Sequence, residues 1–333
     1  MSNDLRYVLG LDGGGSKTEC VVAREDGEIV GRARGGGVNR NFISEEGFEQ
    51  SVHDAAQGAL DTAPQVRRVE RVVGSMGCDG RSMREVAARY SLPHDHMRWV
   101  GESLPARASA EVAYGRTPDI VIVAGTGSLV SGWGRDGVQR GVGGAGCIVG
   151  DEGSAYWIGV RALTRVVECY DGRRPWDDFA QQLTSALDIP DHRSLINRVY
   201  GFGKRPMTRD EMAAVAPHVS RLANAGDPFA RQLFRGAAHE LAFQAEAVIR
   251  MLNLCEESVL IQLYGGCFLA GAVISDPLRE EIVSYAPRAE LLRPLKCTVI
   301  GAAAMALRDA GVDVSTSAVR QRLLVGGRRY DVI

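Results

Sequence analysis

Residues 7–23 read YVLGLDGGGSKTECVVA, two apolar runs on either side of a glycine-rich turn. The β-forming residues in these runs predict strands at 7–12 and 19–23. Asp26-Gly27 then predicts a hairpin into a third strand at 28–33. A helix at 45–60, a strand at 69–74, a helix around 82–89 and a strand at 97–100 complete an α/β layout.

The same pattern recurs about 110 residues further along the chain. A strand at 119–124 leads into Gly125-Thr126-Gly127-Ser128, and a strand at 129–134 is followed by an Asp-Gly hairpin. Such a repeat predicts two similar lobes that face each other across a ligand cleft. The boundaries drawn from the sequence are an N-terminal lobe at 1–118 and a C-terminal lobe at 119–333, with a helical insertion at 155–252.

The second half of the chain is mostly helical in pattern. A strand at 259–264 ends in Gly265-Gly266, and a small-residue helix at about 298–310 is able to pack back on the N-terminal lobe. The basic tail beyond it is expected to be solvated surface. Within the insertion the expected helices span 157–170, 177–187, 196–199, 209–223 and 228–252.

Composition excludes several classes of protein. The 333 residues carry 39 Lys+Arg against 41 Asp+Glu, a net charge of −2 that argues against binding to nucleic acid or to an anionic membrane. The seven cysteines are odd in number and form no CxxC pair, which favours reduced thiols over a disulfide framework or a zinc site. No apolar run approaches the roughly 20 residues of a membrane span, and no secretory leader is recognisable. We therefore expect a cytoplasmic protein.

The first glycine-rich turn has the residue types of a phosphate site. Asp12 ends a strand, and consecutive backbone N–H groups and hydroxyls follow it. Such groups hold phosphate oxygens, and an adjacent carboxylate can hold Mg²⁺ or its waters. The segment is neither a Walker A loop nor a Rossmann fingerprint, because both require a helix after the turn. An ordinary glycine hairpin is the alternative.

Two further segments strengthen the interpretation. The turn at 125–128 repeats the design in the second lobe, so two turns could hold one polyphosphate from both sides. Gly265-Gly266 ends a strand in the second lobe, where a flat nucleoside could lie on backbone. The three segments together predict a nucleotide site.

At this point the chain resembles the superfamily of acetate and sugar kinases, heat-shock proteins and actin. Within it, the chain is similar to N-acetylglucosamine kinases and to the related benzoyl-CoA reductase and 2-hydroxyglutaryl-CoA dehydratase activator ATPases. The stretch GDEGSAYWIG at 150–159 carries the kinase likeness most specifically. The resemblance implies an α/β, ribonuclease H-like, actin-like ATPase fold of two lobes with duplicated mixed sheets and a helical C-terminal lobe.

The resemblance also implies cofactors, partners and site residues. We expect ATP and Mg²⁺ as cofactors, a small sugar or amino-sugar substrate, and a homodimer. Asp12 would be catalytic and serve the Mg²⁺ water shell. The expected nucleotide-binding residues are Gly13, Gly14, Gly15, Ser16, Lys17 and Thr18 in the first turn, Gly125, Thr126, Gly127 and Ser128 in the second, and Gly265 with Gly266. The expected substrate-binding residues are Asn39, Asp79, Gly144, Ala145 and Asp151.

The sequence departs from the kinase pattern in two places. Where family kinases carry Asn-Asp-Ala or Thr-Asp-Ala, this chain has Gly101-Glu102-Ser103, and we expect Glu102 to replace the Asp as general base. Its extra methylene displaces the carboxylate by on the order of 1 Å. Where N-acetylglucosamine kinases show Gly-Gly-Trp-Gly-His, this chain has Gly143-Gly144-Ala145-Gly146-Cys147, which predicts a different or larger substrate.

Three functions stay open from the sequence. The first is an ATP-dependent kinase of an amino sugar, sugar or cyclitol. The second is an activator ATPase, although those proteins carry a cluster-binding Cys just before Gly-Thr-Gly, where this chain has Val121-Ile122-Val123-Ala124. The third is a non-catalytic sensor of sugar or nucleotide.

Overall fold

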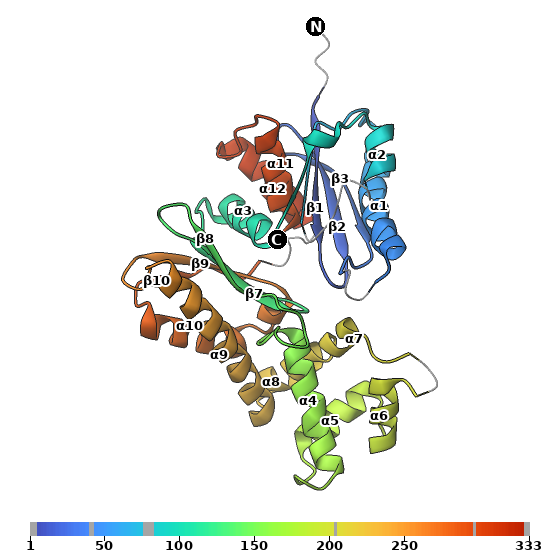
Figure 1. The fold of residues 1–333 in the computed structure, drawn as a ribbon, viewed down its shortest axis with the longest axis vertical. Helices are drawn as coiled ribbons and strands as arrows, with labels where there is room; N and C mark the ends of the chain where they lie inside the picture. The colour runs from blue at the N-terminus through green and yellow to red at the C-terminus, as the bar shows by residue number, and fades with distance from the viewer. Residues whose placement is uncertain (1–4, 40–42, 76–82, 203–204, 296–297, 330–333) are drawn as a thin grey trace. The chain divides into compact units, whose positions relative to one another are not determined.

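The computed structural model describes residues 5–39, 43–75, 83–202, 205–295 and 298–329 (Figure 1). The chain divides into two compact units. Unit 1 comprises Met1–Pro118 and Leu295–Ile333, and unit 2 comprises Asp119–Pro294. None of the described helices combines the length and the hydropathy that a membrane span requires.

Unit 1 is built on a five-stranded mixed sheet in the order β3-β2-β1-β4-β5. The first three strands form the expected antiparallel meander, while β4 and β5 run parallel to β1. The strands are β1 Tyr7–Gly13, β2 Thr18–Arg24, β3 Ile29–Gly35, β4 Arg71–Ser75 and β5 Met97–Val100. The helices are α1 Glu45–Asp61, α2 Arg84–Arg89, η1 His94–His96, α3 Ser103–Tyr114, α11 Val299–Asp309 and α12 Ser317–Arg329.

Alternate residues of β1 face two separate cores. Leu9 and Leu11 pack in the cluster that includes α1, whereas Val8 packs in the cluster that includes α11. Gly10 allows α11 to approach closely, since a Cβ there would lie 2.4 Å from the Ala303 nitrogen. The sheet is therefore covered on both faces, which agrees with the nearly continuous burial of β1.

Residues 295–333 group with unit 1 and not with the residues that precede them. The boundaries drawn from the sequence keep this segment in the C-terminal lobe, with only the helix at about 298–310 able to pack back. The physical reason for the grouping is the small-residue face of α11, where a Cβ on Gly301 would lie 1.9 Å from the Pro105 carbonyl oxygen of α3. Large side chains could not support this approach.

The tail after residue 310 is more than solvated surface. It contains α12, whose Leu323 is fully buried, and a Cβ on Gly326 would lie 2.8 Å from Ile29. Arg322 and Arg328 are exposed, as the sequence predicts. The helix therefore packs an apolar face on the rest of unit 1 and leaves Arg322 and Arg328 exposed, while Arg320 is half-buried.

Unit 2 repeats the sheet of unit 1. Its order is β10-β9-β6-β7-β8, with β6, β7 and β8 antiparallel and with β9 and β10 parallel to β6. The duplicated mixed sheets confirm the expected α/β architecture. The strands are β6 Ile120–Ala124, β7 Ser128–Trp133, β8 Gln139–Gly143, β9 Val259–Tyr264 and β10 Ala289–Leu291.

The helices of unit 2 differ from the sequence prediction between residues 209 and 223, and α10 was not predicted. The single helix expected at 209–223 is wrong, because the chain forms α7 and then α8 with Pro217 in its first turn. Proline lacks the N–H that a continuous helix would need there. The helices are α4 Ala155–Tyr170, α5 Asp178–Leu187, α6 His192–Tyr200, α7 Arg209–Ala213, α8 Ala216–Ala225, α9 Pro228–Met251, η2 Gly266–Ala270 and α10 Ala272–Tyr285.

Candidate active site

One edge of the unit 1 sheet gathers three polar side chains. Strands β1, β4 and β5 are parallel, so their carboxyl ends meet at the same edge. Asp12 lies near the end of β1, Ser75 is the last residue of β4, and Glu102 follows β5 by two residues. The parallel strands therefore bring polar side chains that could take part in a reaction to this edge of the sheet.

Asp12 is held by hydrogen bonds from two elements. Its Oδ1 accepts from the Ser75 hydroxyl at 2.8 Å, and its Oδ2 accepts from the Thr298 backbone N–H at 3.2 Å. Thr298 is the N-cap residue of α11, so the carboxylate lies at the positive end of that helix. The side chain is thereby fixed in position.

The first glycine-rich turn connects β1 to β2. The Gly14 N–H donates to the Lys17 carbonyl oxygen at 2.8 Å, and Ser16 and Lys17 are exposed. Thr18, which the sequence analysis places with the phosphate ligands, is completely buried in β2. Its hydroxyl oxygen has no hydrogen-bond partner in the part of the chain that the structure describes.

Glu19 is a buried charged residue beside the first glycine-rich turn that the sequence analysis did not single out. Its buried carboxylate accepts from Lys17 Nζ at 2.6 Å and pairs with Arg32 and Arg34, each at 2.9 Å. Burial by itself would raise the pKa of Glu19, but the hydrogen bonds from Lys17 and Arg32 outweigh it and lower the pKa to about 2. Three cations surround one carboxylate, so a net positive charge remains beside the turn. Only the alternating pattern of β2 could have suggested from the sequence that Glu19 lies beside this turn.

Asn39 lies next to the same turn. The Val38 N–H donates to the Gly14 carbonyl oxygen at 2.9 Å, and a Cβ on Gly37 would lie 1.9 Å from the Gly15 carbonyl oxygen. Glycine at position 37 therefore lets the segment that carries Asn39 pack directly on the turn. Asp79, the second predicted substrate residue of this lobe, lies outside the described residues.

Glu102 occupies the N-cap position of α3 without capping it. Its backbone is helical and its side chain accepts no capping hydrogen bond from the helix. The residue is half-buried, between the end of β5 and a helix that packs on α11. Glu102 therefore lies at the same sheet edge as Asp12 and Ser75.

In unit 2 the second glycine-rich turn lies at the start of α4. The Gly125 N–H donates to the Gly127 carbonyl oxygen at 2.9 Å, and the Ala155 N–H at the first turn of α4 donates to the Gly125 carbonyl oxygen at 2.9 Å. The partly exposed turn thus presents backbone near a helix N-terminus, a setting that favours anions.

The structure brings Gly265 and Gly266 to this turn. Strands β6 and β9 are parallel, so both end at the same sheet edge. Gly265 has a φ of +117°, and a Cβ there would lie 2.4 Å from the Ala124 carbonyl oxygen. Two of the three predicted nucleotide segments are therefore neighbours within unit 2.

Asp151 supports the second turn through a buried ion pair. Its Oδ1 accepts from the Ser128 N–H at 3.2 Å, and its Oδ2 pairs with the Arg209 guanidinium at 2.7 Å. Asp151 has a left-handed φ of +61°, an unusual conformation for a residue with a side chain. A Cβ on Gly127 would lie 2.1 Å from Arg209, so glycine is needed there. The sequence analysis missed Arg209, since it follows Asp151 by 58 positions.

Gly144 and Ala145 lie beside the same turn. The Gly144 N–H donates to the Ser128 carbonyl oxygen at 2.9 Å, and both residues are exposed. Ile148 and Val149, further along this loop, are 93% and 76% exposed. The loop therefore presents an open surface beside the second glycine-rich turn.

The donor groups fit a nucleotide with its cation better than a protein-only metal site. Among the described residues, no three His, Cys, Asp or Glu side chains gather into a metal cluster. Mg²⁺ is commonly held by one carboxylate together with phosphate oxygens and water. Asp12 can supply that carboxylate, and the Thr18 hydroxyl and the Thr298 hydroxyl are buried polar groups whose partners are missing from the described residues.

These features define a class of fold. Two units with the same five-stranded sheet order, each with a glycine-rich turn after its first strand, form an actin-like ATPase of the sugar-kinase type. Residues 9–306 match the model of the BadF/BadG/BcrA/BcrD ATPase family, and the chain belongs to that family.

Relatives with assigned activities cover most of the chain. An N-acetylmuramic acid/N-acetylglucosamine kinase of Clostridium acetobutylicum is 25% identical over 91% of this chain and 98% of its own length. An N-acetyl-D-glucosamine kinase of Dictyostelium discoideum is 26% identical over 90% of this chain and 98% of its own length. The solved structure of a candidate N-acetylglucosamine kinase from Porphyromonas gingivalis has the same fold, with a TM-score of 0.68 at 18% identity, covering 91% of this chain and 99% of that one.

Proposed function

We propose that the protein transfers the γ-phosphoryl group of ATP to a hydroxyl of an amino sugar or a related sugar. The observation that carries the proposal is the edge of the unit 1 sheet, where Asp12, the glycine-rich turn and Glu102 follow parallel strands. The kinase activities of the relatives, which match about nine-tenths of the chain, support the same reaction.

In this proposal both glycine-rich turns bind the phosphates of ATP. In unit 1 the turn at residues 14–17 would place backbone groups such as the Gly15 N–H against the phosphates, next to the cations that surround Glu19. The turn at residues 125–128 would do the same in unit 2, and Gly265 with Gly266 would lie under the nucleoside. Backbone N–H groups and fixed cations stabilise the charge that develops on the transferred group.

Glu102 would act as the general base. Its carboxylate accepts the proton of the attacking sugar hydroxyl while the new O–P bond forms and the bond between the γ-phosphorus and the ADP oxygen breaks. Glu102 is half-buried and follows β5 at the same sheet edge as Asp12, which supports this role. A positioned base of this kind contributes about 10²–10⁴-fold to the rate.

Asp12 would hold the cation that accompanies ATP. Magnesium, when bound, neutralises charge on the phosphate oxygens. The hydrogen bonds from Ser75 and Thr298 keep the Asp12 side chain in one orientation, so the position of the cation would be set before the nucleotide arrives.

The substrate would be recognised by Asn39 and Asp79 in the first lobe and by Gly144 and Ala145 in the second. Asp151 is buried and is bound by Ser128 and Arg209, so we assign it the role of positioning the turn and not of contacting the sugar. Ala145 offers no aromatic surface, and the exposed loop around it leaves room for a bulky substituent on the sugar.

We further propose a homodimer in the cytoplasm. The five described cysteines are free thiols, in keeping with a reducing compartment. Light scattering coupled to size-exclusion chromatography tests the dimer, and a mass of about 36 kDa instead of about 72 kDa would contradict it.

The test is ADP release from ATP and Mg²⁺ with a panel of acceptors. The panel contains N-acetylglucosamine, glucosamine, glucose, N-acetylmannosamine, N-acetylmuramic acid and cyclitols. We expect turnover that depends on an amino sugar and that Glu102→Gln lowers by about 10²–10⁴-fold. Glu46→Gln, at an exposed glutamate of α1, is the matched control.

Two outcomes would contradict the proposal. ATP turnover without any acceptor, unchanged by Glu102→Gln, would favour an activator-type ATPase. Absence of turnover, while ATP or a sugar still raises the thermal stability, would favour the sensor.

A further inference from the structure

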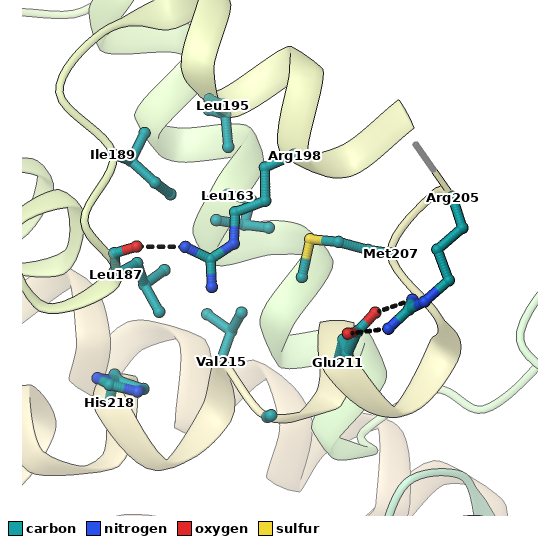
Figure 2. Close-up of a pocket in the computed structure, with 11 residues that line it drawn as sticks. Leu163, Leu187, Ile189, Leu195, Arg198, Arg205, Met207, Glu211, Val215 and His218 are labelled. Carbon is teal, nitrogen blue, oxygen red and sulfur yellow. Dashed lines mark hydrogen bonds and ion pairs between the residues drawn. The ribbon is translucent and has the colours of Figure 1, made fainter. Parts of the chain in front are cut away.

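The helical region of unit 2 contains a partly open cavity that takes no part in the proposed reaction. Its volume is about 410 Å³ (Figure 2). Residues of α4, the end of α5, α6, α7 and α8 line it, together with Ile189 between α5 and α6 and with Arg205 and Met207 before α7. This volume falls in the range of small-molecule sites. The wall is mainly apolar and includes Leu163, Leu195, Met207 and Val215.

One arginine of the lining lacks a carboxylate partner. The Arg198 guanidinium extends into the ring of lining residues and donates to the Leu187 carbonyl oxygen (Figure 2). Within the described residues, no carboxylate pairs with Arg198. Arg205, on the other side of the cavity, is different, because both of its terminal nitrogens donate to Glu211 at 2.7 and 2.6 Å. Of the two arginines in the described lining, Arg198 is therefore the one whose guanidinium, although exposed, has no carboxylate partner and can pair with an anionic ligand.

A second cationic group lies beside it. Arg221 Nη2 is 2.7 Å from His218 Nδ1, and among the described residues no carboxylate pairs with either. Burial lowers the pKa of His218, and the positive charges of Arg221 and Arg198 lower it further. His218 therefore lines the cavity close to two positively charged side chains.

We infer that this cavity binds a small amphipathic anion, with an apolar body against Leu163, Leu195 and Val215 and a carboxylate or phosphate on Arg198. Apolar walls favour the body of such a ligand, and a guanidinium pairs with two oxygens of its acidic group at once. A neutral apolar molecule would leave Arg198 without a counter-ion, and a fully polar anion would gain nothing from the wall. The inference does not rest on the proposed kinase reaction.

Isothermal titration calorimetry on the full chain tests the inference. The probes are octanoate, octyl phosphate and uncharged octanol. We expect at least one of the two anions to bind with 1:1 stoichiometry and at least tenfold more tightly than octanol. A preference for octyl phosphate would point to a phosphate ester, and a preference for octanoate to a carboxylate; either preference supports the site.

Variants locate the binding. Arg198→Gln should weaken the tighter anion at least tenfold, whereas Arg193→Gln, at an exposed arginine of the same helix outside the lining, should leave the affinity unchanged. Leu187→Trp should fill the cavity from its rim and abolish binding of all probes. Equal affinities for the anions and octanol, or equal effects of the two arginine substitutions, would overturn the inference.

Discussion

At the scale of single residues, the ion pair between Asp151 and Arg209 stabilises the second glycine-rich turn. Their ion pair is almost completely buried, and the other Asp151 oxygen accepts from Ser128. We expect Asp151→Asn to lower the free energy of unfolding by about 3–5 kcal/mol, because it leaves the Arg209 cation buried without its counter-ion. Urea denaturation measures the change.

A double-mutant cycle measures the interaction energy between Asp151 and Arg209 separately from their contacts with other residues. Adding Arg209→Met to Asp151→Asn removes the uncompensated cation, so the double variant should be more stable than Asp151→Asn alone. Additive losses from the two substitutions would show that the ion pair does not stabilise the turn.

Glu19 makes stability depend on pH. Its pKa falls from 4.5 to about 2 on folding, so the ionised side chain stabilises the fold at pH 7 by about 3 kcal/mol. Because the folded pKa is the lower one, this contribution is lost as the pH falls from about 5 to about 2. The difference in free energy of unfolding between wild type and Glu19→Gln should be about 2 kcal/mol smaller at pH 3 than at pH 7. Urea titrations at both pH values measure it, and a difference that does not change with pH would contradict the account; Glu46→Gln is the control.

At the scale of secondary-structure elements, the packing of α11 on β1 holds the Asp12 side chain in position. The close approach depends on Gly10, and the N-cap residue of α11 donates to Asp12. Gly10→Ala should cost about 1–3 kcal/mol, because its methyl group meets the backbone of α11 and not a flexible side chain. The displaced helix should also raise KM for ATP.

Gly141→Ala is the matched control for this substitution. Gly141 also lies in a strand, but its Cβ would meet nothing nearer than 3.7 Å. Thermal unfolding and ATP kinetics of the two variants should therefore differ clearly. Equal behaviour would mean that the contact between α11 and β1 tolerates a methyl group.

Some of the strands and helices could be predicted from the sequence pattern alone, and others could not. Alternation and turn residues predict β1, β2 and β3, since these strands form an antiparallel meander whose pairs are close in sequence. The prediction omits α3, whose first turn contains Pro105, and α10, which has Pro277 in its interior. The grouping of α11 with unit 1 depends on contacts between residues almost 200 positions apart, such as Ser109 and Gly301. The periodicity of hydrophobic residues in the sequence does not predict such contacts.

At the scale of the whole molecule, the duplicated sheet explains why two glycine-rich turns recur in one chain. Each turn follows the first strand of a sheet with the same strand order. The positions of the two turns could be predicted from the sequence, because glycines directly follow an apolar run in each case. Glu19 and Arg209 could not, because one is hidden in a strand and the other reaches Asp151 from a distant helix.

Transfer to a sugar, as opposed to hydrolysis, is the central claim, and ³¹P nuclear magnetic resonance tests it most directly. The protein is incubated with ATP, Mg²⁺ and N-acetylglucosamine or N-acetylmuramic acid, and the phosphorus products are resolved. The account predicts a sugar phosphomonoester that appears in step with ADP in the wild type and in Glu46→Gln, and that is nearly absent in Glu102→Gln. Inorganic phosphate as the product in the presence of every acceptor would contradict it.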